Sequence, residues 1–263
     1  MSNFARGPGN PAGGSPYCRS SPLKPTKAYR NPEFMDSPDA RALRILAEYL
    51  EPQSRLNAEG VEDTIVFFGS ARLPPGSKYY EAARELAFRL TTWSKGLGPE
   101  HLRRFVVCTG GGPGIMEAAN RGASEARGRN VGLTISLPRE EGVNPHVTRE
   151  LAFHFHYFFM RKFWLAYMAK ALIVFPGGYG TLDELFEMLT LKQTKRLTKP
   201  MPIVLFGTEY WNDVINFDAL VRHGTIDAAD VELVHRTDSV DEACKWLIER
   251  LIEKALDQPG GKL

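Results

Sequence analysis

The chain has 263 residues, of which 43% are hydrophobic and 24% are charged. These values are typical of a folded globular protein and exclude a chain that is disordered, collagenous or coiled-coil throughout. With 33 Lys and Arg against 31 Asp and Glu, the formal net charge is only +2, so composition gives no electrostatic case for binding a nucleic-acid backbone.

Membrane and redox signals are weak in this sequence. The longest apolar runs, such as residues 171–175, are far shorter than the roughly 20 residues that cross a bilayer, and the N-terminus lacks the apolar segment of a signal peptide. We therefore expect a cytoplasmic protein with no membrane partner. Cys18, Cys108 and Cys244 have no paired spacing typical of disulfides or zinc sites, so we expect three reduced thiols.

The N-terminal region differs in composition from the rest. Residues 1–38 are rich in proline and glycine and poor in aliphatic side chains, which predicts a flexible or extended tail. Apolar residues at helical spacing, with Ser37 as a candidate cap, predict a leading helix over 38–50. We expect a single domain over 39–256 that includes this helix, and a short C-terminal tail over 257–263.

From residue 64 onward, strand-like and helix-like runs alternate. Several strands are continuously apolar, such as residues 65–68, which indicates that helices cover both faces of the sheet. The pattern predicts a doubly wound, mostly parallel, Rossmann-like α/β domain with three layers. Its strands are expected at 64–68, 105–109, 131–137, 151–157, 171–175 and 202–206, and its helices at 77–94, 113–127, 158–170, 182–197, 211–222 and 240–256.

Three of these strands end in glycine turns, at residues 69–72, 110–114 and 176–181. In such folds ligands bind beyond the carboxyl ends of the strands, and a glycine turn before a helix offers free amides to a phosphate. None of the turns matches G-x-G-x-x-G or G-x-x-x-x-G-K-[ST], which disfavours NAD binding and P-loop ATPase chemistry through those motifs. One such turn alone is most simply a tight connection, but three together favour a phosphate-bearing ligand.

Glu184 lies three residues after Thr181, and this spacing has two interpretations. The T-x-x-E pattern is that of a capping box, in which both side chains bond the first amides of a helix. A glutamate in the first turn behind a glycine cradle would also be held ionised by the helix dipole, where it can stabilise positive charge. The spacing leaves both interpretations open.

Other charged residues are similarly ambiguous. Arg161 and Lys162 fit a solvated helix face or contacts to a phosphate or sugar hydroxyl. Glu117 fits an early-helix carboxylate or a contact to a ligand hydroxyl. His154 and His156 share one face of a strand, but no third ligand has suitable spacing, so we expect buried histidines and no metal. Aromatic residues on the helix with Arg161 are expected to pack in the core: Phe159, Phe163, Trp164 and Tyr167.

Residues 176–184 match the P-G-G-x-G-T-x-x-E signature of the Lonely Guy (LOG) family, whose members are often mislabelled lysine decarboxylase-like. Residues 160–162 resemble the arginine–lysine element of that family, and residues 67–71 resemble its first glycine–serine turn. Residues 110–122 are similar to its triple-glycine element. The resemblance covers residues 64 to about 207.

The resemblance implies hydrolysis of the N-glycosidic bond of an adenine nucleoside 5'-monophosphate, either AMP or an N6-prenylated cytokinin nucleotide. The products would be the free base and ribose 5-phosphate. Glu184 would be the catalytic carboxylate and Arg161 its partner. No metal or organic cofactor is implied, and we expect a homodimer or higher homo-oligomer. The substrate-binding residues would be Ser70, Gly111, Gly112, Glu117, Glu140, Lys162, Gly177, Gly178, Gly180 and Thr181.

Chemically, this assignment is consistent with an oxocarbenium-like state stabilised by a carboxylate while the bound phosphate positions the ribose. A pyridoxal-dependent decarboxylase would need a lysine in a recognisable pyridoxal motif, and neither Lys162 nor Lys170 has one. The alternative is a binding module that holds a phosphorylated ligand without cleaving it, as molybdenum-cofactor carriers do. An interaction scaffold with a vestigial pocket is a third alternative, which the intact glycines disfavour.

Overall fold

The computed structural model describes residues 24–98, 101, 103–136 and 142–261, which belong to two units divided between Arg44 and Ile45. The described part of the first unit contains three short helical segments, η1 (Ala28–Arg30), α1 (Pro32–Met35) and η2 (Pro38–Ala40). The first two lie where the sequence predicts a tail, and η2 lies where it predicts the start of the leading helix. The Arg44 guanidinium donates to the carbonyls of Met35 and Ser37 at 2.5 and 2.7 Å, and these bonds hold the end of α1 to the residues that follow η2. Residues 1–23 of the predicted tail lie outside the described residues.

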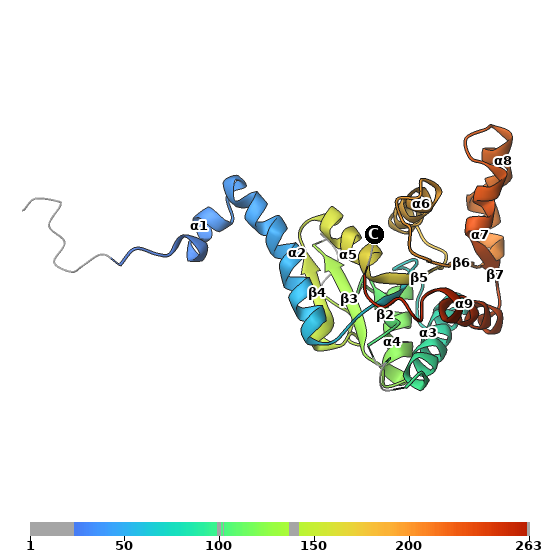
Figure 1. Ribbon diagram of the computed structural model, residues 1–263, viewed down its shortest axis with the longest axis horizontal. Helices are drawn as coiled ribbons and strands as arrows, with labels where there is room; N and C mark the ends of the chain where they lie inside the picture. The colour runs from blue at the N-terminus through green and yellow to red at the C-terminus, as the bar shows by residue number, and fades with distance from the viewer. Residues whose placement is uncertain (1–23, 99–100, 102, 137–141, 262–263) are drawn as a thin grey trace, which may run out of the picture. The chain divides into compact units, whose positions relative to one another are not determined.

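The second unit is built on a seven-stranded sheet in the order β4-β3-β2-β1-β5-β6-β7, and every strand pair is parallel (Figure 1). The order runs outward in opposite directions from β1 and from β5, so the switch point of the sheet lies between these two strands. This confirms the doubly wound α/β fold. The strands are β1 (Thr64–Phe68), β2 (Val106–Thr109), β3 (Asn130–Ile135), β4 (Ala152–Phe155), β5 (Ala169–Val174), β6 (Ile203–Phe206) and β7 (His235–Thr237).

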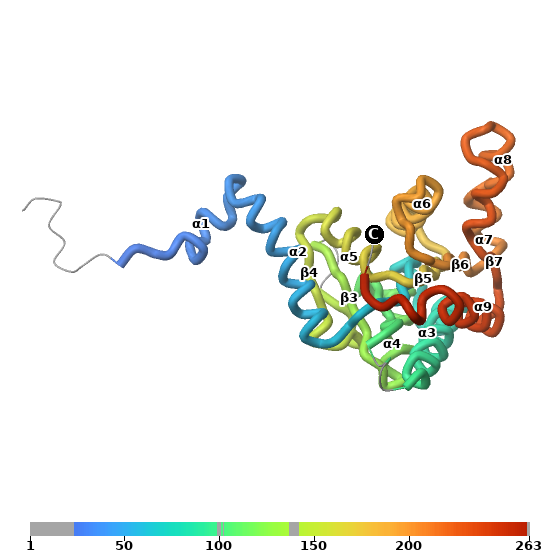
Figure 2. Tube along the Cα trace, in the orientation of Figure 1, coloured from blue at the N-terminus to red at the C-terminus, as the bar shows by residue number. Residues whose placement is uncertain are grey.

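Helices cover both faces of the sheet, giving three layers (Figures 1 and 2). Along β1, Ile65 and Phe67 pack on one face against α3 (Lys78–Gly96), α4 (Ile115–Glu125) and α9 (Val240–Lys254). Val66 and Phe68 pack on the other face with residues of α2 (Arg41–Ala58), α5 (Phe158–Met168), α6 (Tyr179–Gln193) and α7 (Thr208–Val214). The continuously apolar strand therefore contributes side chains to the two hydrophobic cores on opposite faces of the sheet, as predicted from its pattern.

The leading helix runs eight residues beyond the predicted end at residue 50, through Pro52, because a tertiary contact replaces the missing hydrogen bond. Proline has no N–H to bond the carbonyl four residues earlier, which is that of Glu48. The Trp164 indole of α5 donates to that carbonyl at 3.0 Å. The Glu48 carboxylate also accepts from the backbone N–H groups of His156 and Tyr157 at the start of α5, so α2 holds α5 in place.

Other differences from the sequence expectation are local. The predicted helix over 211–222 is two helices, α7 and α8 (Phe217–Arg222), because Asn216 begins a new helix by accepting from the Ala219 amide. The sequence did not indicate β7, which has only three residues. Two short 3-10 helices, η4 (Arg149–Leu151) and η5 (Ala228–Leu233), complete the described elements of this unit.

The helices and the cysteine thiols test two expectations from the sequence. None of the helices in the described ranges is long and apolar enough to span a bilayer. Cys108 and Cys244 are free thiols, and burial raises the pKa of each. Cys18 lies outside the described residues.

A buried ion pair joins the segments that lead into β1 and β2, and its arginine also bonds the backbone just after α9. Asp63 and Arg104 are 0% and 2% exposed, and the Arg104 Nε donates to Asp63 Oδ2 at 2.6 Å. The remaining guanidinium nitrogens donate to the carbonyls of Ala255 and Leu256. The second Asp63 oxygen accepts from the amide of Phe105, a bulky residue in the left-handed region at φ 56°. Asp63 therefore stabilises both a buried cation and an unfavourable backbone conformation.

We predict that Asp63→Ala lowers the free energy of unfolding by about 3–5 kcal/mol, because it removes the carboxylate bonded to the buried Arg104 guanidinium and leaves only that of Glu62, 4.0 Å from Nε. Urea denaturation followed by circular dichroism measures this change. The control is Glu253→Ala, which removes the exposed pair with Arg250 and should change stability by about 0.5 kcal/mol or less. A loss below about 1 kcal/mol for Asp63→Ala would contradict the importance of this pair.

Candidate functional site

Two glycine turns meet at the switch point of the sheet, and the third lies beside them. β1 and β5 are neighbours, so the turns that follow them, at 69–72 and 176–181, emerge side by side. The Ser70 amide donates to the Pro176 carbonyl at 2.9 Å, and the Ile115 amide donates to the Ser70 carbonyl at 3.0 Å. Gly114 has φ 68°, and a Cβ there would lie 2.3 Å from the Ser70 oxygen, so only glycine permits this approach.

A cleft of about 680 Å³ opens above these turns. It is lined by residues from the three turns, from α5 and from α7. The structure thus brings together residues that are far apart in the sequence. The predicted site residues that line the cleft are Ser70, Arg161, Gly177, Gly178, Gly180, Thr181 and Glu184.

The capping-box interpretation of Thr181 and Glu184 is wrong. Helix α6 begins at Tyr179 with Gly178 as its N-cap, and no side chain caps it. Thr181 is therefore the third helical residue and packs on Gly177, where a Cβ would lie 2.1 Å from the threonine hydroxyl oxygen. The first amides of the helix, from Gly178 to Thr181, have no partner within the helix and can bind an anion.

Arg161 of α5 meets Glu184 of α6 inside the cleft. Arg161 Nη2 lies 3.5 Å from Glu184 Oε1, and the two side chains are 16% and 4% exposed. The other carboxylate oxygen, Glu184 Oε2, and the Arg161 Nε are both buried and have no hydrogen-bond partner. A buried polar atom without a partner is unfavourable, so this pair is arranged to contact a further polar group.

Burial raises the pKa of Glu184 to about 7, although Arg161 and Lys162 lower it. The cause is the apolar surface behind the carboxyl group, where Phe68, Leu165 and Met188 line a small cavity with Glu184. The sequence-based expectation that the helix dipole holds this group ionised is wrong, because Glu184 lies in the second turn and is desolvated. Both protonation states are populated near neutral pH.

Lys162 does not line the cleft. Its ammonium group lies 2.8 Å from an Asp183 carboxylate oxygen and 3.2 Å from one of Glu187, so it links α5 to α6. Burial acts to lower the pKa of Lys162, but the hydrogen bonds to these two carboxylates outweigh burial, so the pKa is raised above its ordinary value. The role of Lys162 in the structure is to hold the two helices that carry Arg161 and Glu184.

Three more predicted substrate-binding residues lie outside the cleft lining. The side-chain amide of Asn144 donates to the carbonyls of Gly111 and Gly112, both at 3.1 Å, and so fixes the triple-glycine turn. Glu117 accepts a hydrogen bond from the Tyr80 hydroxyl at 3.1 Å. Glu140 lies outside the described residues.

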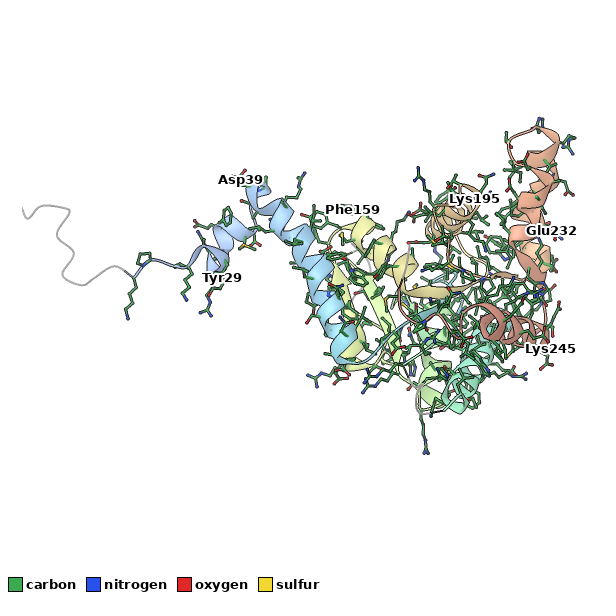
Figure 3. The ribbon with its side chains drawn as sticks, in the orientation of Figure 1. Tyr29, Asp39, Phe159, Lys195, Glu232 and Lys245 are labelled. Atoms are coloured by element: carbon green, nitrogen blue, oxygen red, sulfur yellow. The ribbon has the colours of Figure 1, made fainter. Side chains whose placement is uncertain are left out.

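The histidine and aromatic predictions are partly wrong. His154 is exposed and bonds the hydroxyls of Thr134 and Ser136, both at 2.9 Å, and His156 is also exposed. Within the described ranges, no group of three or more His, Cys, Asp or Glu is placed to hold a metal ion. Trp164 is buried as predicted, whereas Phe159 near the start of α5, labelled in Figure 3, is 54% exposed.

Among the lining residues that the sequence did not assign to the site are Arg72, Met116, Phe158 and Tyr210. Arg72 is two residues after Ser70 in a turn that the sequence indicates, and its charge was the available signal. Tyr210 lies on α7, beyond the last glycine turn, and its hydroxyl donates to the Gly177 carbonyl. No sequence pattern connects Tyr210 to the signature, so only the structure identifies it.

Known proteins resemble this chain over most of the second unit. The family model described as "possible lysine decarboxylase" matches residues 116–247. The cytokinin riboside 5'-monophosphate phosphoribohydrolase LOG3 of Arabidopsis thaliana is 30% identical over 188 residues, which cover 70% of this chain and 80% of the relative. The pyrimidine/purine nucleotide 5'-monophosphate nucleosidase of Escherichia coli K12 is 32% identical over 132 residues, or 46% of this chain and 29% of that enzyme.

Among solved structures, the molybdenum cofactor binding protein of Rippkaea orientalis superposes with a TM-score of 0.50. It is 21% identical and covers 73% of this chain and 98% of its own, a likeness that shows a shared fold. The family match and the relationship to LOG3 agree with the nine-residue signature at 176–184, which the structure places at the cleft. The chain therefore belongs to the Lonely Guy (LOG) family, whose family model carries the description "possible lysine decarboxylase".

Proposed function

We propose that the protein hydrolyses the N-glycosidic bond of adenine nucleoside 5'-monophosphates, such as AMP or an N6-prenylated analogue, to the free base and ribose 5-phosphate. The buried Arg161–Glu184 pair carries this proposal, because it lies in the same cleft as the free amides of α6. The names of the relatives agree in kind, since both a phosphoribohydrolase and a nucleotide nucleosidase act on nucleoside 5'-monophosphates.

The N-terminus of α6 is the proposed phosphate site. Its free amides and the positive end of its dipole attract a phosphate without any charged side chain. Thr181, packed on Gly177 and lining the cleft, adds a hydroxyl beside these amides. Helix α6 begins at Tyr179, and Glu184 lies five residues later on the same helix. Binding energy from the phosphate would therefore position the ribose against Glu184.

Glu184 acts in its deprotonated form in this proposal. As the bond between C1' and the purine nitrogen breaks, its electron pair leaves with the base, and positive charge develops on the ribose. The unpartnered Oε2 of Glu184 stabilises that charge and accepts a proton from the water whose oxygen joins C1', while the departing base takes up a proton from solvent. Arg161 holds the other oxygen and favours the charged form of the carboxylate.

We predict that Glu184→Gln lowers kcat for AMP on the order of 10²-fold or more, because the change removes the negative charge but keeps the shape. KM should change by only a few-fold, since the proposed phosphate contacts are backbone amides. Chromatographic detection of free adenine and N6-prenyladenine, from AMP and isopentenyl-AMP, measures both constants. Glu249→Gln is the control, because it removes an exposed carboxylate on α9 that does not line the cleft.

Two outcomes would contradict this assignment. A folded Glu184→Gln protein with nearly wild-type kcat would make Glu184 a structural residue. A wild-type protein that binds AMP tightly but releases no base from any nucleotide would favour the alternative of a carrier for a phosphorylated ligand.

The pH dependence tests the protonation state. Because burial raises the pKa of Glu184 to about 7, the carboxyl is mostly protonated at lower pH. We predict that kcat/KM rises with pH and levels off above about 7, with a fall of about tenfold per pH unit on the acidic side. In Arg161→Gln the cation that lowers this pKa is lost, so the acidic limb should move to higher pH.

The phosphate of the substrate also titrates, with a second pKa of about 6. A protein variant cannot move the pKa of the free substrate, so a limb that shifts in Arg161→Gln belongs to the enzyme. A limb that falls with rising pH through neutrality would instead indicate that the protonated carboxyl is the active form. A limb at the same pH in Arg161→Gln would contradict the assignment of that limb to Glu184.

A further inference from the structure

Tyr210 contacts the signature turn from outside the region that carries the family signature. Its hydroxyl donates to the carbonyl of Gly177, and the residue also lines the cleft. Tyr210 is held by its neighbour Trp211, whose ring lies edge-on at 5.0 Å. Trp211 is 1% exposed and donates from its indole to the Phe206 carbonyl at 3.0 Å. The hydroxyl of Tyr210 therefore projects from a firmly packed helix.

This hydrogen bond orients the peptide unit between Gly177 and Gly178. In a planar trans peptide the carbonyl and the following N–H point in opposite directions. Tyr210 holds the Gly177 carbonyl, so the Gly178 N–H points away from Tyr210. The preceding peptide unit is held from the other side, because the Pro176 carbonyl accepts from the Ser70 amide at 2.9 Å.

Such an anchor matters because this turn has little stiffness of its own. Gly177, Gly178 and Gly180 have no Cβ, and glycine loses more conformational freedom on ordering than any other residue. Helix α6 has no side-chain cap that could fix its first amides. Without the Tyr210 hydroxyl, the peptide unit between Gly177 and Gly178 could rotate and aim its N–H away from a bound anion.

We propose that Tyr210 is a positioning residue that aims the Gly178 amide at the 5'-phosphate of the substrate. The inference rests on the proposed function for the identity of that phosphate. Tyr210 acts through the Gly177 carbonyl and takes no part in breaking the glycosidic bond. It extends phosphate recognition to α7, beyond the glycine turns.

The test compares phosphorylated and unphosphorylated substrates in Tyr210→Phe, which removes only the hydroxyl. KM for AMP should rise about tenfold, as for the loss of one hydrogen bond to a phosphate-binding turn, while kcat stays within about threefold. The kcat/KM for adenosine should be unchanged, because adenosine has no phosphate to lose. The melting temperature should stay within a few degrees.

The matched control is Tyr157→Phe. The Tyr157 hydroxyl is buried, has no hydrogen-bond partner and does not line the cleft. Its removal should leave KM for AMP unchanged. This variant shows whether deleting a tyrosine hydroxyl that does not bond the glycine turn affects the assay.

An unchanged KM for AMP in Tyr210→Phe would overturn the proposal. Equal losses for AMP and adenosine would also overturn it, because they would indicate a general structural role or a contact to the base. Calorimetry separates this inference from the proposed function. If wild type cleaves neither substrate but binds AMP, an about tenfold weaker Kd in Tyr210→Phe still supports the positioning role, and an equal Kd overturns it.

Discussion

The burial of one carboxylate beside one guanidinium is the constraint on which the site depends. Glu184 is 3% exposed, and burial opposes its charge strongly enough to bring its pKa to about 7. Arg161 offsets part of that penalty but occupies only one of the two oxygens. A buried carboxylate with one oxygen unpartnered lowers the stability of the folded state. Such a destabilising arrangement is expected of a residue that is retained for chemistry.

The rest of the fold holds this pair in position. Glu48 of α2 accepts hydrogen bonds from the amides of His156 and Tyr157, just before α5, which carries Arg161. The Trp164 indole supplies the hydrogen bond that Pro52 cannot donate. Lys162 ties α5 to α6 through the carboxylates of Asp183 and Glu187, which lie on either side of Glu184 along α6. Parallel strands then bring the glycine turns to the same edge of the sheet, so the start of α6 and Glu184 line one cleft.

The sequence predicted the architecture well because the strands carry a strong local signal. β1 has the predicted bounds, since a short run rich in β-branched and aromatic residues follows Asp63 and a glycine turn ends it. The start of α6 was misplaced because glycine at the N-cap leaves no side-chain signal, and the T-x-x-E spacing imitates a capping box. The extension of α2 through Pro52 depends on Trp164, more than a hundred residues away, which no local pattern reveals.

The candidate site was predictable only where residues belong to a contiguous motif. The signature turn, Arg161 and Glu184 meet in the cleft as expected. The raised pKa of Glu184 could not be predicted, because it depends on Phe68, Leu165 and Met188 from other elements. Tyr210 and Phe158 line the cleft through tertiary packing, whereas Gly111, Gly112 and Glu117 bond partners outside the cleft lining.

The most direct measurement is a crystal structure of Glu184→Gln soaked with AMP, in which slow turnover preserves the ligand. The account predicts the phosphate oxygens at hydrogen-bond distance, about 3 Å, from the amides of residues 178–181, with the ribose C1' facing residue 184 and Arg161. A phosphate bound elsewhere, or an adenine ring in place of the ribose beside residue 184, would contradict the account.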